Sequence, residues 1–192
     1  MSTMNFAKRE ISFKIVYYGP AMSGKTTNLR HIYTLLPQKV KGDFTSIATE
    51  TERTLFFDFL PLELGSIKGF TIRLSLYTVP GQEIYKLTRK SVLRATDGIV
   101  FVADSQRIKE EENIASLEDM FENLVNFGED PESMPLILQY NKRDLQEILT
   151  VEELQATLNK NNKYEYYEAI AENGINVIES LKAITKLVVA KV

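Results

Sequence analysis

The sequence contains no cysteine, and this absence removes several kinds of chemistry at once. Disulfides, thiolate-bound metals and a cysteine nucleophile are excluded, and so are prenylation and palmitoylation, because each needs a cysteine sulfur. Ser2 stands where N-myristoylation requires glycine, so we expect no lipid anchor. Histidine is almost absent as well: His31 is the only one, which leaves no histidine-based triad or cluster.

Long apolar runs are also missing. The longest, such as residues 98–103, is far shorter than the roughly 20 residues of a membrane-spanning helix. Residues 1–10 lack the apolar segment of a signal peptide, so we expect a cytoplasmic protein. The net charge of −3 lacks the basic excess that is typical of nucleic-acid-binding proteins, so no nucleic-acid partner is expected.

What is present is an ordinary globular composition. The chain has 192 residues, of which 44% are hydrophobic and 26% charged, which fits one domain with a substantial buried core. No repeat or Pro/Gly-rich linker interrupts it, and strand-like segments alternate with helix-like ones. This order predicts a single α/β domain over residues 1–192, with helices packed on a mostly parallel sheet.

The hydrophobic pattern of the first half indicates a strand, a helix, a loop and two further strands. Residues 11–18 predict a strand, and residues 26–36 predict a helix after a glycine-containing turn. Residues 39–53 are polar and show no hydrophobic periodicity, which favours an irregular loop. Residues 54–60 are rich in aromatics, and residues 70–77 alternate apolar and polar side chains, as a strand does.

Strands of a different kind occur in the second half. Residues 98–103 and 135–140 are continuous apolar runs, which are typical of strands buried on both faces of a sheet. Apolar side chains recur at helical spacing over residues 114–124 and 177–188, which predicts two amphipathic helices packed on that sheet.

The clearest motif begins at Gly19. The segment Gly19–Thr26 reads GPAMSGKT and matches G-x-x-x-x-G-K-[ST], between a predicted strand and a predicted helix. Glycines let the backbone approach phosphates, and the loop N–H groups with the helix N-terminus favour an anion. In such a loop Lys25 contacts the β- and γ-phosphates, and the Thr26 hydroxyl binds Mg²⁺. The motif predicts a P-loop and by itself leaves GTPases, ATPases and nucleotide kinases open.

A second motif, Asn141-Lys142-Arg143-Asp144, directly follows the apolar run 135–140. Here the chain resembles the Ras-like small GTPases, whose N-K-x-D motif follows the fifth strand. The resemblance implies that Asp144 accepts hydrogen bonds from guanine N1 and N2, that Asn141 braces the site, and that the Lys142 stem covers the base. Adenine presents no matching donor pair, so a site of this type rejects it.

The same resemblance extends to residues 168–172, which fall where small GTPases carry their third guanine loop. It implies that Ala171 offers its backbone N–H to the guanine carbonyl. Ile170 and Glu172 depart from the serine and lysine that are usual there.

The segment Thr78-Val-Pro-Gly81-Gln82 matches the Asp-x-x-Gly-Gln motif of Ras-like proteins with one change. The resemblance implies that the Gly81 N–H touches the γ-phosphate and that Gln82 orients the attacking water. Thr78 replaces the aspartate. A neutral hydroxyl can support a magnesium-bound water but brings no negative charge, so we expect weaker metal affinity.

This Thr-Val-Pro-Gly-Gln variant resembles the bacterial gliding-motility Ras-like GTPases, the MglA family, which control cell polarity. The similarity covers nearly the whole chain. It includes the segments FKIVYYG, SGKTTNL, ATETERTLFFDFL, GIVFVADS and NKRDL. It implies a switch with polarity or motility effectors at a cell pole, and a Roadblock/LC7-type homodimer as the GTPase-activating partner.

The family also implies roles for the first switch segment. Thr54 resembles the threonine that closes over Mg²⁺ and the γ-phosphate, and Arg53 resembles an arginine finger supplied by the same chain. Fingers of this kind are worth roughly 10³–10⁵ in rate. The alternative for Arg53 is a surface ion pair with Glu50 or Glu52.

Ala21 departs from the glycine that the family usually has in the P-loop beside the γ-phosphate. Its methyl group would crowd the glutamine or the finger, so we expect slow intrinsic hydrolysis without an activating partner. The predicted function is a GTP-hydrolysing switch. The alternatives are a GTP-binding scaffold with negligible hydrolysis, and a P-loop nucleotide kinase or ATPase, which would need an acceptor-binding lid and another base site.

The predicted fold is a Ras-like P-loop α/β fold, with a mostly parallel six-stranded sheet and helices on both faces. Catalytic roles are predicted for Arg53 and Gln82, and magnesium binding for Thr26 and Thr54. Nucleotide contacts are predicted for Gly19, Ala21, Met22, Ser23, Gly24, Lys25, Thr26, Thr27, Thr54, Gly81, Asn141, Lys142, Asp144 and Ala171.

Overall fold

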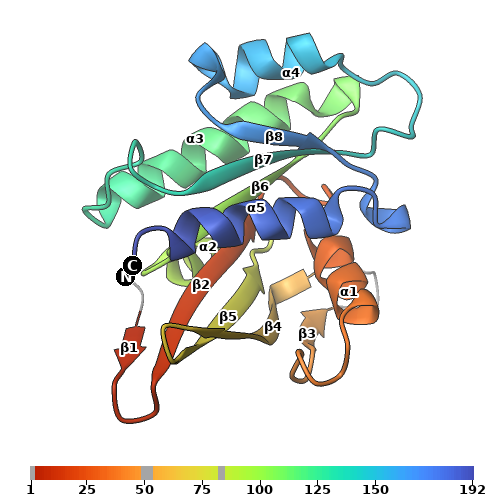
Figure 1. The fold of residues 1–192 in the computed structure, drawn as a ribbon. Helices are drawn as coiled ribbons and strands as arrows, with labels where there is room; N and C mark the ends of the chain where they lie inside the picture. Colours follow the sequence, from red (N-terminus) through yellow and green to blue (C-terminus); the bar gives the residue numbers. More distant parts are fainter. Residues whose placement is uncertain (1–2, 49–53, 82–84) are drawn as a thin grey trace.

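A computed structural model describes residues 3–48, 54–81 and 85–192. Within these residues the chain forms one sheet and five α-helices (Figure 1). The strands are β1 (Thr3–Asn5), β2 (Glu10–Tyr18), β3 (Thr45–Ala48), β4 (Thr54–Ile67), β5 (Phe70–Thr78), β6 (Gly98–Asp104), β7 (Leu136–Asn141) and β8 (Glu165–Glu168). The helices are α1 (Lys25–Leu35), α2 (Lys86–Leu93), α3 (Glu110–Asn126), α4 (Val151–Leu158) and α5 (Val177–Val189), with short 3₁₀ turns at Arg107–Lys109, Lys160–Asn162 and Ala171–Asn173.

The sheet runs in the order β3-β4-β5-β2-β6-β7-β8, and β1 pairs with the start of β2. The pairings of β2 with β5 and β6, of β6 with β7, and of β7 with β8 are parallel; β1, β3 and β4 pair antiparallel. The expected α/β fold with a mostly parallel sheet is confirmed. The described sheet has eight strands rather than the expected six.

Three of these strands match none of the segments predicted from the sequence: β1, β3 and β8, which have three, four and four residues. Strands this short give no recognisable period in the sequence. β3 lies inside residues 39–53, which the sequence analysis expects to be an irregular loop, and that expectation is wrong for residues 45–48. The reason is tertiary: β3 forms because β4 offers it an antiparallel edge.

Helices cover both faces of the sheet. On one face α1 and α5 pack through residues such as Leu29, Ile32 and Ile184, and on the other α2, α3 and α4 pack through residues such as Leu93, Met120 and Leu154. All residues of β6 and β7 are buried, as their continuous apolar runs predict.

One polar cluster interrupts the core between α1, β7 and α5. Asn28 and Gln139 exchange two side-chain hydrogen bonds, of 2.7 and 3.0 Å, and Gln139 also donates to Ser180 Oγ at 2.9 Å. The Asn28 amide donates a further bond to the Gly24 carbonyl at 3.0 Å. The first helix is thus tied to the central sheet by directional bonds as well as by apolar contact.

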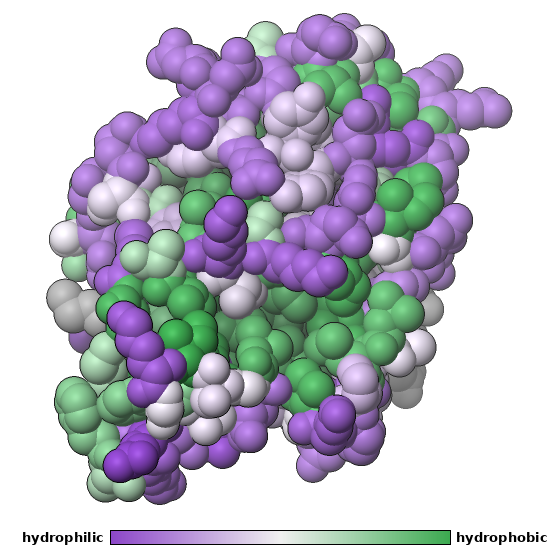
Figure 2. Space-filling model, viewed as in Figure 1, coloured by the Kyte–Doolittle hydropathy of each residue, from purple (hydrophilic) through white to green (hydrophobic). Residues whose placement is uncertain are grey.

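Part of the α5 face is left uncovered by helices. In Figure 2 apolar side chains gather in the lower half of the view, where β1, β2 and β5 run in Figure 1. A cavity of about 270 Å³ there is lined by residues that include Phe6, Ile11, Phe70, Ile72 and Val189. It lies at the amino-terminal end of β2, away from the loop that follows Tyr18. No helix in the described part of the chain is long and apolar enough to cross a bilayer.

Candidate nucleotide-binding site

The predicted phosphate loop joins the end of β2 to the start of α1, and glycines bracket it. Gly19 and Gly24 have φ of +141° and +103°, a region that side chains disfavour. A Cβ on Gly19 would lie 2.2 Å from the Val102 carbonyl oxygen, and one on Gly24 would lie 2.1 Å from Asn141 Nδ2. Both positions therefore require glycine, for backbone conformation and for space.

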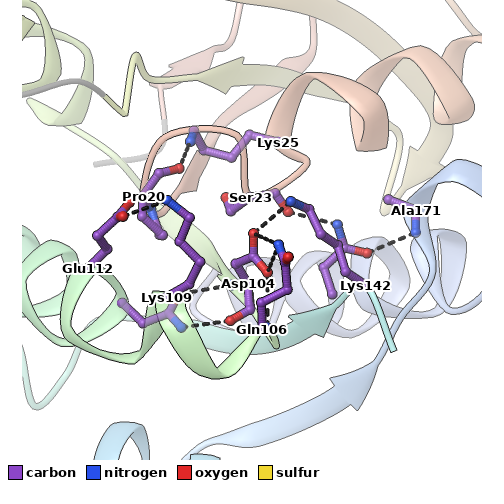
Figure 3. Close-up of polar contacts among 11 residues, drawn as sticks. Pro20, Ser23, Lys25, Asp104, Gln106, Lys109, Glu112, Lys142 and Ala171 are labelled. Atoms are coloured by element: carbon purple, nitrogen blue, oxygen red, sulfur yellow. Dashed lines mark hydrogen bonds and ion pairs between the residues drawn. The ribbon is translucent and has the colours of Figure 1, made fainter. Parts of the chain in front are cut away.

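Lys25 is buried and bends back across this loop, as Figure 3 shows. Its Nζ donates to the Gly19 and Pro20 carbonyls at 3.0 and 2.5 Å. Burial, with a smaller effect of Arg89, lowers the pKa of Lys25 to about 7. A buried ammonium whose hydrogen-bond partners are neutral carbonyls is well suited to an anionic ligand such as phosphate.

The start of α1 presents donors to the same space. Gly24 is the N-cap residue and supplies no side-chain cap, and the first turn contains no acidic residue. The first turn, which includes Thr26 and Thr27, directs its backbone N–H groups out of the end of the helix. The buried Ser23 hydroxyl has no hydrogen-bond partner within the described part of the chain. This end of the helix can thus receive phosphate oxygens.

A buried carboxylate lies beside the Thr26 hydroxyl. Thr26 Oγ1 donates to Asp58 Oδ2 at 2.6 Å, and Thr78 Oγ1 donates to the same oxygen at 2.6 Å. Ser46 donates to Asp58 Oδ1, and the Asp58 N–H donates back to Thr78 Oγ1 at 2.9 Å. These oxygens are hard donors of the kind that Mg²⁺ prefers, so the group fits the metal that Thr26 is predicted to bind.

Sequence reasoning missed Asp58, although a signal was present. It is the only charged residue in the run Thr54-Leu-Phe-Phe-Asp58-Phe-Leu60, and it is fully buried in the structure. Across the described residues no group of three or more His, Asp or Glu side chains gathers to hold a metal. A magnesium ion here would depend on hydroxyls, one carboxylate, phosphate oxygens and water, a combination common for this ion.

Asn141 connects the predicted base-binding segments to the phosphate loop. Its Nδ2 donates to the Ser23 carbonyl at 2.7 Å, and its Oδ1 accepts the Ala171 N–H at 2.8 Å (Figure 3). Three segments far apart in the sequence therefore meet at one side chain. Because the Ala171 N–H is donated to Asn141 here, its predicted bond to guanine requires that this bond be shared or exchanged.

The rest of the N-K-x-D motif lies on the same side. Lys142, at φ +66°, forms an ion pair of 2.6 Å with the buried Asp104, which also accepts from the Gln106 side chain (Figure 3). This pair, which sequence reasoning also missed, holds the lysine stem in place. The Asp144 side chain is exposed and available to a ligand.

The switch residues are described only in part. Arg53 and Gln82 lie outside the described residues, and of Thr54 only the backbone, at the start of β4, is described. Gly81 packs against the phosphate loop at Ala21. Met22 is 70% exposed with φ +60°, so its side chain points away from the protein interior and any contact to nucleotide would come from its backbone.

The sequence of this chain is similar to those of known Ras-family proteins. The profile of the Ras family matches residues 14–190. The chain is 52% identical over 191 residues to the mutual gliding-motility protein MglA of Myxococcus xanthus, covering all of this chain and 97% of that protein. It is 26% identical to the human Ras-related protein Rab-9A, covering 93% and 83% of the two chains. It is 30% identical to human ADP-ribosylation factor-like protein 4A, covering 77% and 66%.

Proposed function

This chain belongs to the Ras family of small GTPases, and we propose that it is a switch that binds GTP and GDP with magnesium and hydrolyses GTP. The observation that carries the proposal is the double contact of Asn141 with Ser23 and Ala171, at 2.7 and 2.8 Å. This contact fixes the spacing between a phosphate-binding loop and a purine-reading loop. One rigid unit can then bind both the phosphates and the base of a nucleotide.

The phosphate end of the proposed site is formed by the chain's own positive groups. Lys25 and the loop N–H groups would hold the β- and γ-phosphates, and the Thr26 and Thr54 hydroxyls would hold magnesium. Magnesium, when bound, supplies positive charge to the β- and γ-phosphate oxygens. Arg53 would stabilise charge that develops on the transferred phosphoryl group, and Gln82 would orient the attacking water.

The base end discriminates between purines. Asp144 would accept hydrogen bonds from guanine N1 and N2, and the Lys142 stem, held by Asp104, would cover the ring. An adenine nucleotide would leave the carboxylate without its donors, which costs affinity. This argues against the alternative of an ATPase or nucleotide kinase. Competition of ATP and GTP against a fluorescent GDP analogue tests it, and equal competition would contradict the proposed base site.

A GTP-binding scaffold with little hydrolysis is the second candidate. It is favoured by Ala21, which stands where the family usually has glycine and which lies against Gly81 in the structure, because a methyl group is expected to crowd the catalytic groups there. Slow hydrolysis in the absence of a partner is expected in either case. Multiple-turnover phosphate release with a Roadblock/LC7-type homodimer separates the two: sustained release supports the switch, and its absence supports the scaffold.

The cellular role is proposed from the relative. The Myxococcus protein is named for mutual gliding motility, and we extend a motility or polarity role to this chain. We propose a G domain over residues 1–192 that is cytoplasmic and is placed at a cell pole by protein partners. Its effectors would recognise the GTP-bound form.

The decisive experiment measures GTP hydrolysis by the wild type, Arg53→Ala and Gln82→Leu, each with and without the Roadblock/LC7-type partner. Loss of roughly 10³-fold or more with the partner is expected for both variants. Arg73→Ala is the matched control, because Arg73 is exposed and pairs with Glu10 and Glu63 on the sheet. If Arg53→Ala hydrolysed GTP at the wild-type rate, the assignment of Arg53 as an arginine finger would be contradicted.

A further inference from the structure

A buried charged network lies on the face of the sheet that α2 and α3 cover. Arg89 Nε, on α2, donates to Asp119 Oδ2, on α3, at 3.1 Å, and the exposed fractions of the two side chains are 8% and 17%. The Tyr18 hydroxyl donates to the same carboxylate oxygen at 2.5 Å. Tyr18 is fully buried and directly precedes Gly19, so one carboxylate connects α2 to the start of the phosphate loop.

The burial of this network restricts how α2 can move. A buried guanidinium or carboxylate is costly unless it is paired, and here Arg89 and Asp119 pair with each other. Burial, together with the hydrogen bond to Asp119, raises the pKa of Tyr18 above its ordinary value, so the hydroxyl stays protonated and remains a donor. A shift of α2 relative to α3 would therefore separate two buried charges.

The same guanidinium reaches the segment that follows β5. Arg89 Nη1 donates to the Pro80 carbonyl at 3.5 Å, a long hydrogen bond. The N–H of Gly81 belongs to the same peptide unit as this carbonyl. Because the C=O and N–H of a trans peptide lie in one plane and point in opposite directions, a contact that orients the carbonyl also orients the N–H.

Gly81 lies where the direction of its N–H matters for a nucleotide. A Cβ on Gly81 would lie 2.2 Å from Ala21 N and 2.5 Å from the Pro20 carbonyl carbon, so this residue lies directly against the phosphate loop. The resemblance to Ras-like proteins implies that the Gly81 N–H contacts the γ-phosphate. Arg89 thus contacts the peptide unit that would recognise the terminal phosphate.

We propose that Arg89 is a positioning residue for recognition of the γ-phosphate: held by Asp119, it orients the Pro80–Gly81 peptide, whose N–H binds that phosphate. The inference rests on the proposed function, because it concerns how the GTP-bound form is distinguished from the GDP-bound form. Arg89 acts through the peptide and does not itself touch the nucleotide. Its loss therefore weakens binding of the triphosphate and leaves binding of the diphosphate unchanged.

The test measures the affinity of the full chain for GDP and for a non-hydrolysable GTP analogue, by competition against a fluorescent GDP analogue in saturating magnesium. Arg89→Lys keeps a positive charge for Asp119, but a single ammonium does not reproduce the fork that joins Asp119 to Pro80. Affinity for the GTP analogue should fall roughly 10-fold, as expected for one hydrogen bond to a charged group, while GDP affinity stays at the wild-type value. A merely structural role would lower both affinities equally, and an unchanged ratio of the two would overturn the proposal.

Arg73→Lys is the matched control. It makes the same chemical change on β5, where Arg73 is exposed and pairs with Glu10 and Glu63. This variant should keep the wild-type ratio of the two affinities. An equal change of the ratio in Arg73→Lys and Arg89→Lys would overturn the proposal.

Asp119→Asn keeps the test valid if Arg89→Lys does not fold. It retains the shape of the side chain and removes the charge that holds Arg89, so affinity for the GTP analogue should fall roughly threefold with GDP affinity unchanged. If Arg89→Lys does fold, the double variant should bind the analogue no more weakly than Arg89→Lys alone, because residues that act through one contact are not additive. Effects that multiply in the double variant would contradict a shared role.

The outcomes also separate this inference from the proposed function. Failure of the wild type to bind either guanine nucleotide would contradict the proposed function itself. Normal binding by the wild type, with its ratio of affinities unchanged in both Arg89→Lys and Asp119→Asn, would overturn only the role of Arg89.

Discussion

Gly81 and Ala21 are in direct backbone contact. A Cβ on Gly81 would lie 2.2 Å from Ala21 N and 2.4 Å from Ala21 Cα, distances that no side-chain rotation can relieve. Gly81 therefore approaches the phosphate loop at main-chain atoms.

Gly81→Ala should separate the switch segment from the phosphate loop, because the added methyl group meets backbone that is held on both sides. Single-turnover GTP hydrolysis should fall roughly 10- to 100-fold, since displacements of about 1 Å can cost that much in rate. GDP affinity should be nearly unchanged, because the phosphate and base loops remain. An equal loss of GDP affinity would show instead that the phosphate loop itself is damaged.

Ala21→Gly removes the methyl group that we expect to crowd the catalytic groups beside the γ-phosphate. Single-turnover hydrolysis without a partner should rise about threefold or more, a lowering of the barrier by about 0.6 kcal/mol for each threefold gain. This variant should not rescue Gly81→Ala, because that clash involves the backbone at position 21. A rate equal to or below the wild type would remove the crowding explanation.

Asp144→Asn should weaken binding of a fluorescent GDP analogue by roughly 100-fold, the equivalent of about 3 kcal/mol for lost charge-assisted hydrogen bonds. Asp130→Asn makes the same chemical change at an exposed turn beyond α3 and should leave affinity at the wild-type value. Equilibrium fluorescence titration measures both. Equal affinities would mean that another group reads the base.

Thr150→Ala should destabilise the fold by about 1 kcal/mol, because it removes the N-cap of α4. Thr150 and Glu153 form a reciprocal capping box there, with bonds of 3.2 and 2.7 Å. Urea unfolding at fixed, saturating GDP should show a lower midpoint and an unchanged slope. An unchanged midpoint would mean that the helix end is satisfied by water as well as by threonine.

The pH dependence of stability should change when Arg107 is removed. The guanidinium of Arg107, with the backbone N–H of Thr150, lowers the pKa of Glu153 from its ordinary 4.5 to about 2. A lowered carboxyl pKa contributes stability that is complete above 4.5 and is lost as the pH falls toward 2. The effect is small, because both side chains are exposed.

Arg107→Ala should therefore unfold at slightly lower urea concentration than the wild type near neutral pH, and the difference should shrink below pH 4.5. An NMR titration of the Glu153 carboxyl gives the direct measurement: its pKa should return toward the ordinary value in the variant. An unshifted carboxyl in the wild type would contradict the prediction.

The fold was predictable where burial produces a clear hydrophobic pattern in the sequence. β6 and β7 are buried on both faces, so their sequences are unbroken apolar runs. β4 is different: the predicted strand ends at Leu60, but the structure continues it to Ile67. Pro61 and Gly65 discourage a strand locally, and pairing with β5 overrides them with a register shift between Glu63 and Ser66.

The site was predictable where its residues are neighbours in sequence. Gly19 and Gly24 have positive φ, as a compact phosphate loop requires. The spacing of the two glycines in the motif predicts such a loop. Two partners of Asp58, Thr26 and Thr78, are 32 and 20 residues away, and they are brought to it by the packing of α1 on β4 and by the register of β4 against β5. No local pattern contains that information.

The exchange of hydrogen bonds between Asn28 and Gln139 has a consequence for how the phosphate loop is aligned. Apolar side chains alone would allow α1 to slide slightly along the sheet with little change in energy, whereas a pair of amides has one position that satisfies both. The Asn28 bond to the Gly24 carbonyl passes this alignment to the last residue of the loop before Lys25. The depth at which a nucleotide sits is thus set partly from inside the core, by side chains that never touch it.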